Sequence, residues 1–67
     1  MKIKIDTDFI KLDQLLKYAA IVQSGAEAKE MIKSEMVQVN GEICTQRGKK
    51  LRSGDRVDVE GEELIIE

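Results

Sequence analysis

The sequence predicts an α+β fold, in which two helices pack on a small, mostly antiparallel sheet of about four to five strands. Three observations lead to this fold class. Leucines recur at helical spacing within residues 11–20, a helix start signal begins at Ser24, and short apolar-polar alternation recurs between residues 37 and 66. The chain has 67 residues, which suits a single domain spanning residues 1–67.

The first third of the chain predicts a strand followed by a helix. Residues 2–6 alternate polar and apolar side chains, as in a strand with one buried face. A helix is expected over about residues 11–20, with either Thr7 or Asp8 as its cap. Residues 21–23 then form a connector that carries apolar side chains into the core. The positions that define the helical stripe are Leu12, Leu15, Leu16 and Ala19.

A capping box marks the start of the second helix. In Ser24-Gly25-Ala26-Glu27 the Ser24 hydroxyl can accept from the Glu27 backbone N–H, and the Glu27 carboxylate can accept from the Ser24 N–H. Lys29 and Lys33 are four residues apart and therefore share an outward face. The buried stripe of this helix is expected to comprise Ala28, Met31 and Ile32.

An Asn40-Gly41 pair predicts a hairpin that joins strands over residues 37–39 and 42–44. A type I′ turn needs two positive φ angles, and Asn and Gly adopt such angles most readily. The hairpin turn is therefore the structural role expected of Asn40 and Gly41.

The segment Arg47–Arg52, called here the basic segment, follows the hairpin and is expected to be a loop. Ser53-Gly54-Asp55 then turns into a strand over residues 56–59, with Gly54 and Asp55 as turn residues. Glu60-Gly61 turns into a last strand over residues 64–66. The predicted order is strand, helix, helix, two strands, basic loop and two strands.

The composition excludes several classes of site. One cysteine and no histidine leave no internal disulfide and no ordinary mixed zinc site, and no cofactor is expected. No secretory signal or membrane span is evident, and a lone cysteine fits the reducing cytoplasm. Met1 fits a natural start, so we expect a whole gene product.

The charges are distributed unevenly along the chain, although the formal net charge is −2. Residues 11–52 hold eight Lys/Arg and five Asp/Glu, which gives +3. The two ends hold three Lys/Arg and eight Asp/Glu, which gives −5. If the two ends pair with each other, one face can be positive while another repels polyanions.

Five pieces of the sequence, in this order, resemble a known family. They are Lys11–Lys17, Ser24–Lys29, Val37–Glu42, Arg47–Leu51 and Gly54–Val57. Together they resemble the RNA-binding domain first described in ribosomal protein S-four, also called the αL motif, and within it the short stand-alone YaaA/YbcJ-like members. The resemblance covers about residues 9–60. It implies the two-helix fold described above and a partner that is ribosomal or other structured RNA.

Two departures from the family pattern are present. Many members carry Ser-Arg at the start of the second helix, with the Arg touching RNA, whereas this chain has Ser24-Gly25. A Gly is common two residues before the first hairpin Val, and here that position is Glu35. The second departure leaves the helix end without the residue that usually adopts the left-handed conformation.

The basic segment is the main candidate for RNA contact, through Arg47, Lys49, Lys50 and Arg52. A polyphosphate backbone is bound by several cations held close together, because binding releases condensed counterions. The alternative is an ordinary solvated loop, which the residues alone would favour. The resemblance shifts the interpretation to RNA contact.

Further contacts are expected from Lys11, Lys29 and Lys33. The resemblance places Lys11 and Lys29 at basic positions of the family, whereas Lys33 can instead pair with Glu30. Ser24 and Gly25 are also candidate RNA contacts, because a residue without a Cβ at a helix N-terminus lets a phosphate approach the free N–H groups. The capping box, however, already explains Ser24. Cys44 is interpreted as a half-buried strand residue.

The leading function is a non-catalytic module that recognises structured RNA through phosphate and shape contacts, in ribosome assembly or translation. Only Phe9 and Tyr18 are aromatic and neither lies in a predicted strand, so no platform for stacking bases is expected. The alternative is a protein-interaction adaptor that uses the same basic face on an acidic partner. An enzyme is rejected, since no catalytic motif, metal-ligand set or phosphate-binding glycine loop occurs. We expect a monomer with no membrane or small-molecule partner.

Overall fold

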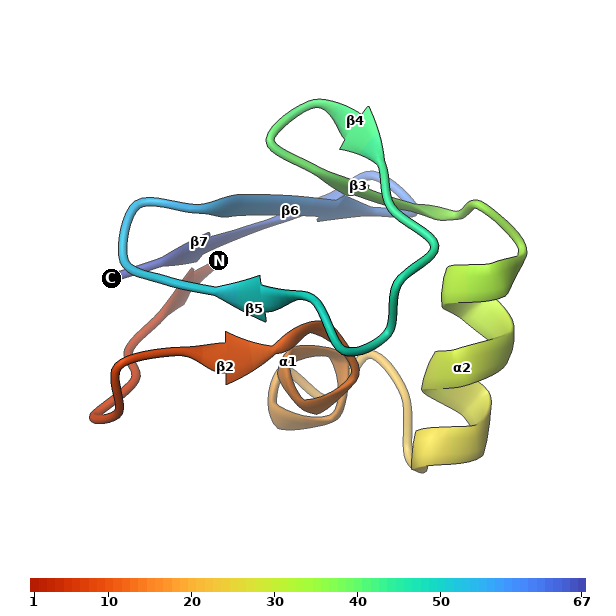
Figure 1. Ribbon diagram of the computed structural model, residues 1–67, viewed down its shortest axis with the longest axis horizontal. Coiled ribbons are helices and arrows are strands. Elements are labelled where there is room, and N and C mark those ends of the chain that lie inside the picture. The colour runs from red at the N-terminus through yellow and green to blue at the C-terminus, as the bar shows by residue number, and fades with distance from the viewer.

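The computed structural model describes residues 1–67 as an α+β fold, as the sequence predicts. The two helices are α1 (Leu12–Tyr18) and α2 (Gly25–Lys33), and Figure 1 shows both on one side of the main sheet. That sheet has the strand order β1-β7-β6-β3-β4, and a second sheet pairs β2 with β5. The strands are β1 (Lys2–Ile3), β2 (Ile10–Lys11), β3 (Val37–Val39), β4 (Glu42–Ile43), β5 (Lys50–Leu51), β6 (Arg56–Val59) and β7 (Glu62–Ile66).

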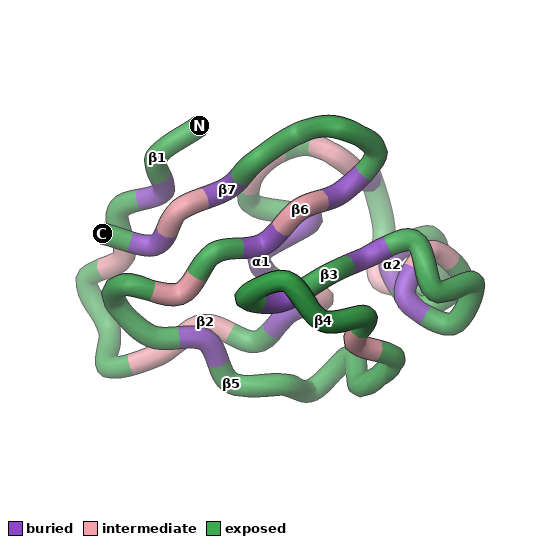
Figure 2. The backbone as a smooth tube through the Cα atoms, turned by 90° about the horizontal axis from the view of Figure 1, so that it is seen from above, coloured by how far each residue is buried: buried purple, intermediate pink, exposed green.

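The core is entirely apolar and draws on both helices and both sheets (Figure 2). Fourteen residues are buried, and none of them is polar or charged. Alternation places every second residue of β3 and β6 in this core, so that Val37 and Val39 of β3 are buried while Gln38 between them is exposed. Residue Met31, expected in the buried stripe of α2, is only half-buried, so Ala28 and Ile32 carry that stripe.

Two tight turns organise the antiparallel part of the main sheet. Asn40 and Gly41 have φ angles of +52° and +87°, and they join β3 to β4 as the sequence predicts. Glu60 and Gly61 repeat this conformation, with φ angles of +49° and +84°, between β6 and β7. The strand after Gly61 begins at Glu62, two residues earlier than expected.

The two ends of the chain lie side by side, because β1 pairs in parallel with β7. Lys2 lies opposite Ile65 and Ile3 lies opposite Ile66. The N-terminal ammonium also donates a hydrogen bond to the Glu63 carbonyl oxygen at 2.6 Å. Six of the eight acids of the two ends belong to residues 55–67, which form β6, β7 and the turns beside them, whereas Asp6 and Asp8 lie in the bend of residues 6–8.

The predicted end of the first strand and the predicted cap of the first helix were wrong, whereas the helix itself lies within the expected residues 11–20. The strand ends at Ile3, residues 6–8 form a bend, and the helix covers Leu12–Tyr18 with Lys11 as its cap. Neither Thr7 nor Asp8 caps it, and the Lys11 N–H donates instead to the Gln14 side-chain oxygen at 3.3 Å. The cause is the pairing of Ile10–Lys11 with β5, a partner about forty residues away that local patterning cannot reveal.

Both helices end in the same backbone motif, with a non-glycine residue in the left-handed conformation. After α1, Ala20 has φ +61°, and the N–H groups of Ala20 and Ile21 donate to the carbonyls of Lys17 and Leu16. After α2, Glu35 has φ +62°, and the matching bonds run from Glu35 to Ile32 and from Met36 to Met31. The expectation that Glu35 would leave this helix end without a left-handed residue was therefore wrong. Neither helix has the length or apolar character needed to cross a membrane.

We predict that Glu35→Gly raises the free energy of unfolding by about 1 kcal/mol, because an L-residue is strained in the left-handed region and glycine is not. Chemical denaturation of the two proteins measures the difference. Glu30→Gly, on the exposed surface of the same helix, is the matched control and should lower stability by about 0.5–1 kcal/mol. A destabilised Glu35→Gly protein would show that the side chain of Glu35 stabilises this turn.

Candidate nucleic-acid interface

The basic segment is fixed to the N-terminus of α1 by backbone hydrogen bonds. The Leu12 N–H donates to the Lys49 carbonyl oxygen at 2.9 Å, and the Asp13 N–H donates to the Arg47 carbonyl oxygen at 3.1 Å. These are two of the N–H groups that a helix N-terminus leaves without intrahelical partners. The basic segment thus takes the place of a side-chain cap, while the side chains of Arg47 and Lys49 stay exposed.

The β2–β5 ladder makes the second attachment and brings Lys11 to the basic segment. Lys11 lies directly opposite Lys50, and Ile10 lies opposite Leu51. Leu51 is fully buried in the core, so the neighbouring Lys50 and Arg52 point the other way, toward solvent. The expectation of a loop over residues 47–52 was therefore partly wrong, since β5 lies within it.

Phe9 places an aromatic ring beneath the ammonium group of Lys50. The Lys50 ammonium lies 4.8 Å from the centroid of the Phe9 ring, within range of a cation–π interaction. Phe9 precedes β2 and is half-buried. This role of Phe9 is not evident from the sequence, because only the register of the β2–β5 ladder brings Phe9 near Lys50.

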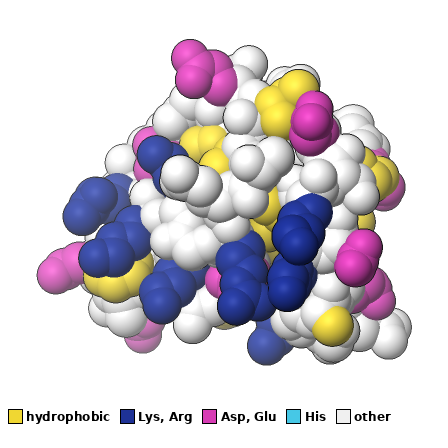
Figure 3. All heavy atoms as spheres, turned by 45° about the vertical axis from the view of Figure 1, so that its right-hand side comes forward, with side chains coloured by type: hydrophobic (Ala, Val, Ile, Leu, Met, Phe, Trp, Pro, Cys, Tyr) yellow, Lys and Arg dark blue, Asp and Glu magenta, His cyan; other side chains and the backbone are white.

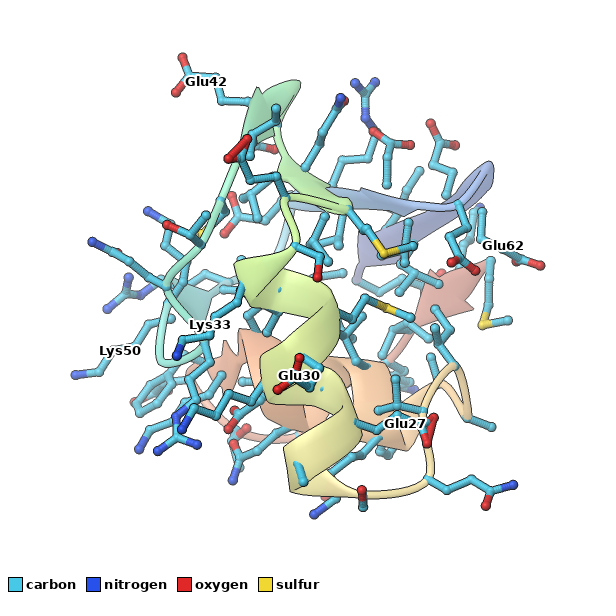
Figure 4. All side chains as sticks on the ribbon, turned by 90° about the vertical axis from the view of Figure 1, so that its right-hand side faces the viewer. Glu27, Glu30, Lys33, Glu42, Lys50 and Glu62 are labelled. Carbon is cyan, nitrogen blue, oxygen red and sulfur yellow. The ribbon has the colours of Figure 1, made fainter.

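The two lysines of α2 extend the cationic surface across a second element. Lys29 and Lys33 are both exposed and lie one turn apart. Figure 4 shows Lys33 on the side of α2 that faces the basic segment, with Lys50 farther out in the same direction and Glu27 on the opposite side of the helix. The seven exposed cations Lys11, Lys29, Lys33, Arg47, Lys49, Lys50 and Arg52 are called the basic face below.

No carboxylate neutralises the basic face at short range. Both ion pairs in the protein belong to Arg56, which lies 3.2 Å from Asp58 and 3.7 Å from Glu63 on the main sheet. The alternative pairing of Lys33 with Glu30 does not occur within the 4.0 Å limit of an ion pair. Figure 3 shows the Lys and Arg side chains gathered over the lower part of one face, with Asp and Glu mainly at its margins.

Ser24 and Gly25 lie at the end of α2 that is remote from Lys33. The Ser24 hydroxyl accepts from the Glu27 N–H at 3.2 Å, which is one half of the predicted capping box. The return bond from the Ser24 N–H to the Glu27 carboxylate is absent, so that half of the prediction was wrong. A Cβ on Gly25 would meet no atom within 4 Å, so packing does not require glycine there. Lys29 lies between this helix end and Lys33.

The turn residues tie the end of the basic segment to the hairpin. The Asp55 carboxylate accepts from the Arg52 N–H at 2.8 Å and from the Asn40 side-chain amide at 3.1 Å. The Asn40 amide oxygen in turn accepts from the Arg56 N–H at 2.9 Å. Gly54 lies in the turn at φ +95°, beside Asp55. Asn40 and Asp55 therefore do more than fill turns, because they clamp β5 and β6 to the β3–β4 turn.

Comparison with known proteins now identifies the family. The S4 domain model matches residues 3–67, which is nearly the whole chain. The chain belongs to the S4 domain family. It is also similar to a protein of Bacillus subtilis (strain 168) described as "Probable ribosome maturation protein RlbA", with 48% identity over 59 residues, covering 88% of this chain and 83% of the relative. The match extends beyond residues 9–60, the part that carries the resemblance in sequence.

We predict that Leu51→Ala lowers the free energy of unfolding by about 2–5 kcal/mol, because it removes fully buried methyl groups that hold the basic segment in the S4 domain. Denaturant titration followed by circular dichroism measures this loss. Arg52→Ala, at the exposed neighbouring position, should stay within about 0.5 kcal/mol of wild type. Equal effects of the two substitutions would contradict an anchoring role for Leu51.

Proposed function

We propose that this S4 domain binds structured RNA through its basic face, by contacts to phosphates and to the shape of the folded RNA. The observation that carries the proposal is the convergence of cations from β2, α2 and the basic segment, with no carboxylate within ion-pair distance. Phosphate backbones recruit such surfaces by releasing condensed counterions. The function is one of binding and not of catalysis.

The positions of the positive charges on the basic face lower the stability of the free protein but favour binding of a polyanion. Lys11 and Lys50 lie directly opposite each other on one ladder, a placement that is destabilising for like charges. Cations beside the N-terminus of α1 also meet the positive end of its peptide dipoles. Both features are unfavourable in the free protein and become favourable when a polyanion lies across the surface.

Ribosomal RNA is the target that the comparisons support. The similar protein from Bacillus subtilis is described as a probable ribosome maturation protein, and it matches most of this chain. We therefore propose that the basic face contacts ribosomal RNA during ribosome maturation. A role for the same face as an adaptor for an acidic protein has no separate observation in its favour.

We predict that changing Arg47, Lys49, Lys50 and Arg52 together to Glu abolishes binding to a folded ribosomal RNA fragment while the fold is retained. The four side chains are exposed and form no ion pair, and the segment is held mainly by backbone hydrogen bonds and by Leu51. Fluorescence anisotropy at several salt concentrations measures the affinity, and circular dichroism checks the fold. A wild-type affinity that is flat with salt would contradict phosphate contact.

A matched pair of single substitutions refines the test. Lys49→Gln should reduce the slope of log affinity against log salt by about 0.7–0.9, the value for one lost phosphate contact. Lys2→Gln removes an exposed lysine of β1, in the other sheet, and should leave the slope unchanged. Equal slopes for both variants would place the RNA elsewhere. A cellular protein complex that survives ribonuclease and depends on Lys49 would favour the adaptor.

A further inference from the structure

A concavity of about 1070 Å³ lies beside the basic face, between residues 4–11 and the outer surface of α1. Ligand pockets commonly measure about 300–1,000 Å³, so this open concavity offers room for a nucleotide without enclosing it. Figure 1 shows this segment as a loop that runs from β1 to β2, after which the chain enters α1. The function proposed above does not use this concavity, except through Lys11 at its edge.

Tyr18 is the large aromatic surface of this concavity. It is the last residue of α1, it is 65% exposed, and its hydroxyl lies 3.5 Å from the Lys4 carbonyl oxygen. The ring thus reaches from the helix toward the segment after β1, instead of covering the core. Exposed aromatic rings stack unpaired bases, and every base offers such a face. The strands carry no aromatic platform for stacking bases, as expected, but α1 presents one exposed aromatic ring, that of Tyr18.

The charged groups of the concavity suit the phosphate and the base of a nucleotide. Lys4, Lys11 and Lys17 line it and can meet a phosphate. Asp6 and Asp8 also line it, in the bend of residues 6–8, and their carboxylates can accept from the amino groups of a base. The acids would repel a bare phosphate backbone, so an unpaired nucleotide suits this space better than a duplex does.

The concavity is continuous with the basic face. Lys11 belongs to both, and Phe9, which also lines the concavity, carries Lys50 of the basic segment 4.8 Å above its ring. Lys11 of the basic face and Tyr18 therefore line one and the same concavity. No other exposed aromatic side chain occurs in the protein.

We propose that this concavity is a subsite for one unpaired nucleotide of the bound RNA, with the base stacked on Tyr18 and the adjoining phosphate at Lys11 and Lys17. The inference rests on the proposed function, which it deepens. The preferred ligand is then a folded RNA in which an unpaired nucleotide adjoins a duplex.

Two RNA hairpins that share the same structured, internally stacked tetraloop test the subsite. The stem is fully paired in one (the paired hairpin) and contains a single unpaired nucleotide in the other (the unpaired hairpin). Wild type should bind the unpaired hairpin more tightly, and Tyr18→Ala should lower that affinity about 5- to 150-fold while leaving binding to the paired hairpin unchanged. Unchanged binding to the paired hairpin also shows that the variant is folded. Tyr18→Phe keeps the ring and should bind both hairpins as wild type does.

Tyrosine fluorescence gives a direct second readout, because Tyr18 is the single tyrosine and the chain has no tryptophan. Stacking should quench this emission when the unpaired hairpin is added and much less when the paired hairpin is added. Equal affinities of wild type for both hairpins, with no difference in quenching, would overturn the subsite and leave the proposed function standing. If Tyr18→Ala lowered the affinities for the paired and the unpaired hairpin equally, the subsite would be overturned in favour of a structural role for Tyr18. Failure of wild type to bind either hairpin would overturn both proposals.

Discussion

Two hydrogen bonds at the start of α1 determine how the cations of this protein are presented. The N–H groups of Leu12 and Asp13 donate to carbonyl oxygens of the basic segment, so this segment completes the helix and the helix positions the segment. Buried N–H groups of a helix end require partners, and no cap side chain supplies them here. A shift of the basic segment would leave these donors without partners, and the β2–β5 ladder would be lost with them.

The placement of the acids on the fold explains how a chain of net charge −2 carries a basic face. Six of the eight acids of the two ends lie on β6, β7 and the turns beside them, and the Arg56 ion pairs keep Asp58 and Glu63 on the main sheet. Cations from distant parts of the sequence are held on a different surface. The local field that a polyanion meets depends on this separation and not on the total charge, because charges farther away than about 10 Å are largely screened in salt.

The sequence predicted those features whose signals are local. Asn40-Gly41 specifies its turn by φ angles, and Ser24 reveals a helix start by its hydroxyl. The pairing of Ile10 with Leu51 was not predictable, because it depends on which apolar residues meet in the core. Glu35 was misjudged for a related reason: backbone hydrogen bonds to Met31 and Ile32 hold a left-handed turn that propensity alone disfavours. The role of Phe9 followed from the same unforeseen ladder.

The anchoring of the basic segment also bears on how tightly RNA can be held. Leu12 and Leu51, which adjoin the hydrogen-bonded groups, are fully buried in one core, so the backbone of the segment cannot move freely without disturbing that core. Binding therefore does not have to order this backbone, and only the long Lys and Arg side chains lose freedom. The ring of Phe9 restricts one of these side chains in advance, that of Lys50. A rigid backbone with mobile cations suits recognition of a phosphate pattern whose shape is already set by the folded RNA.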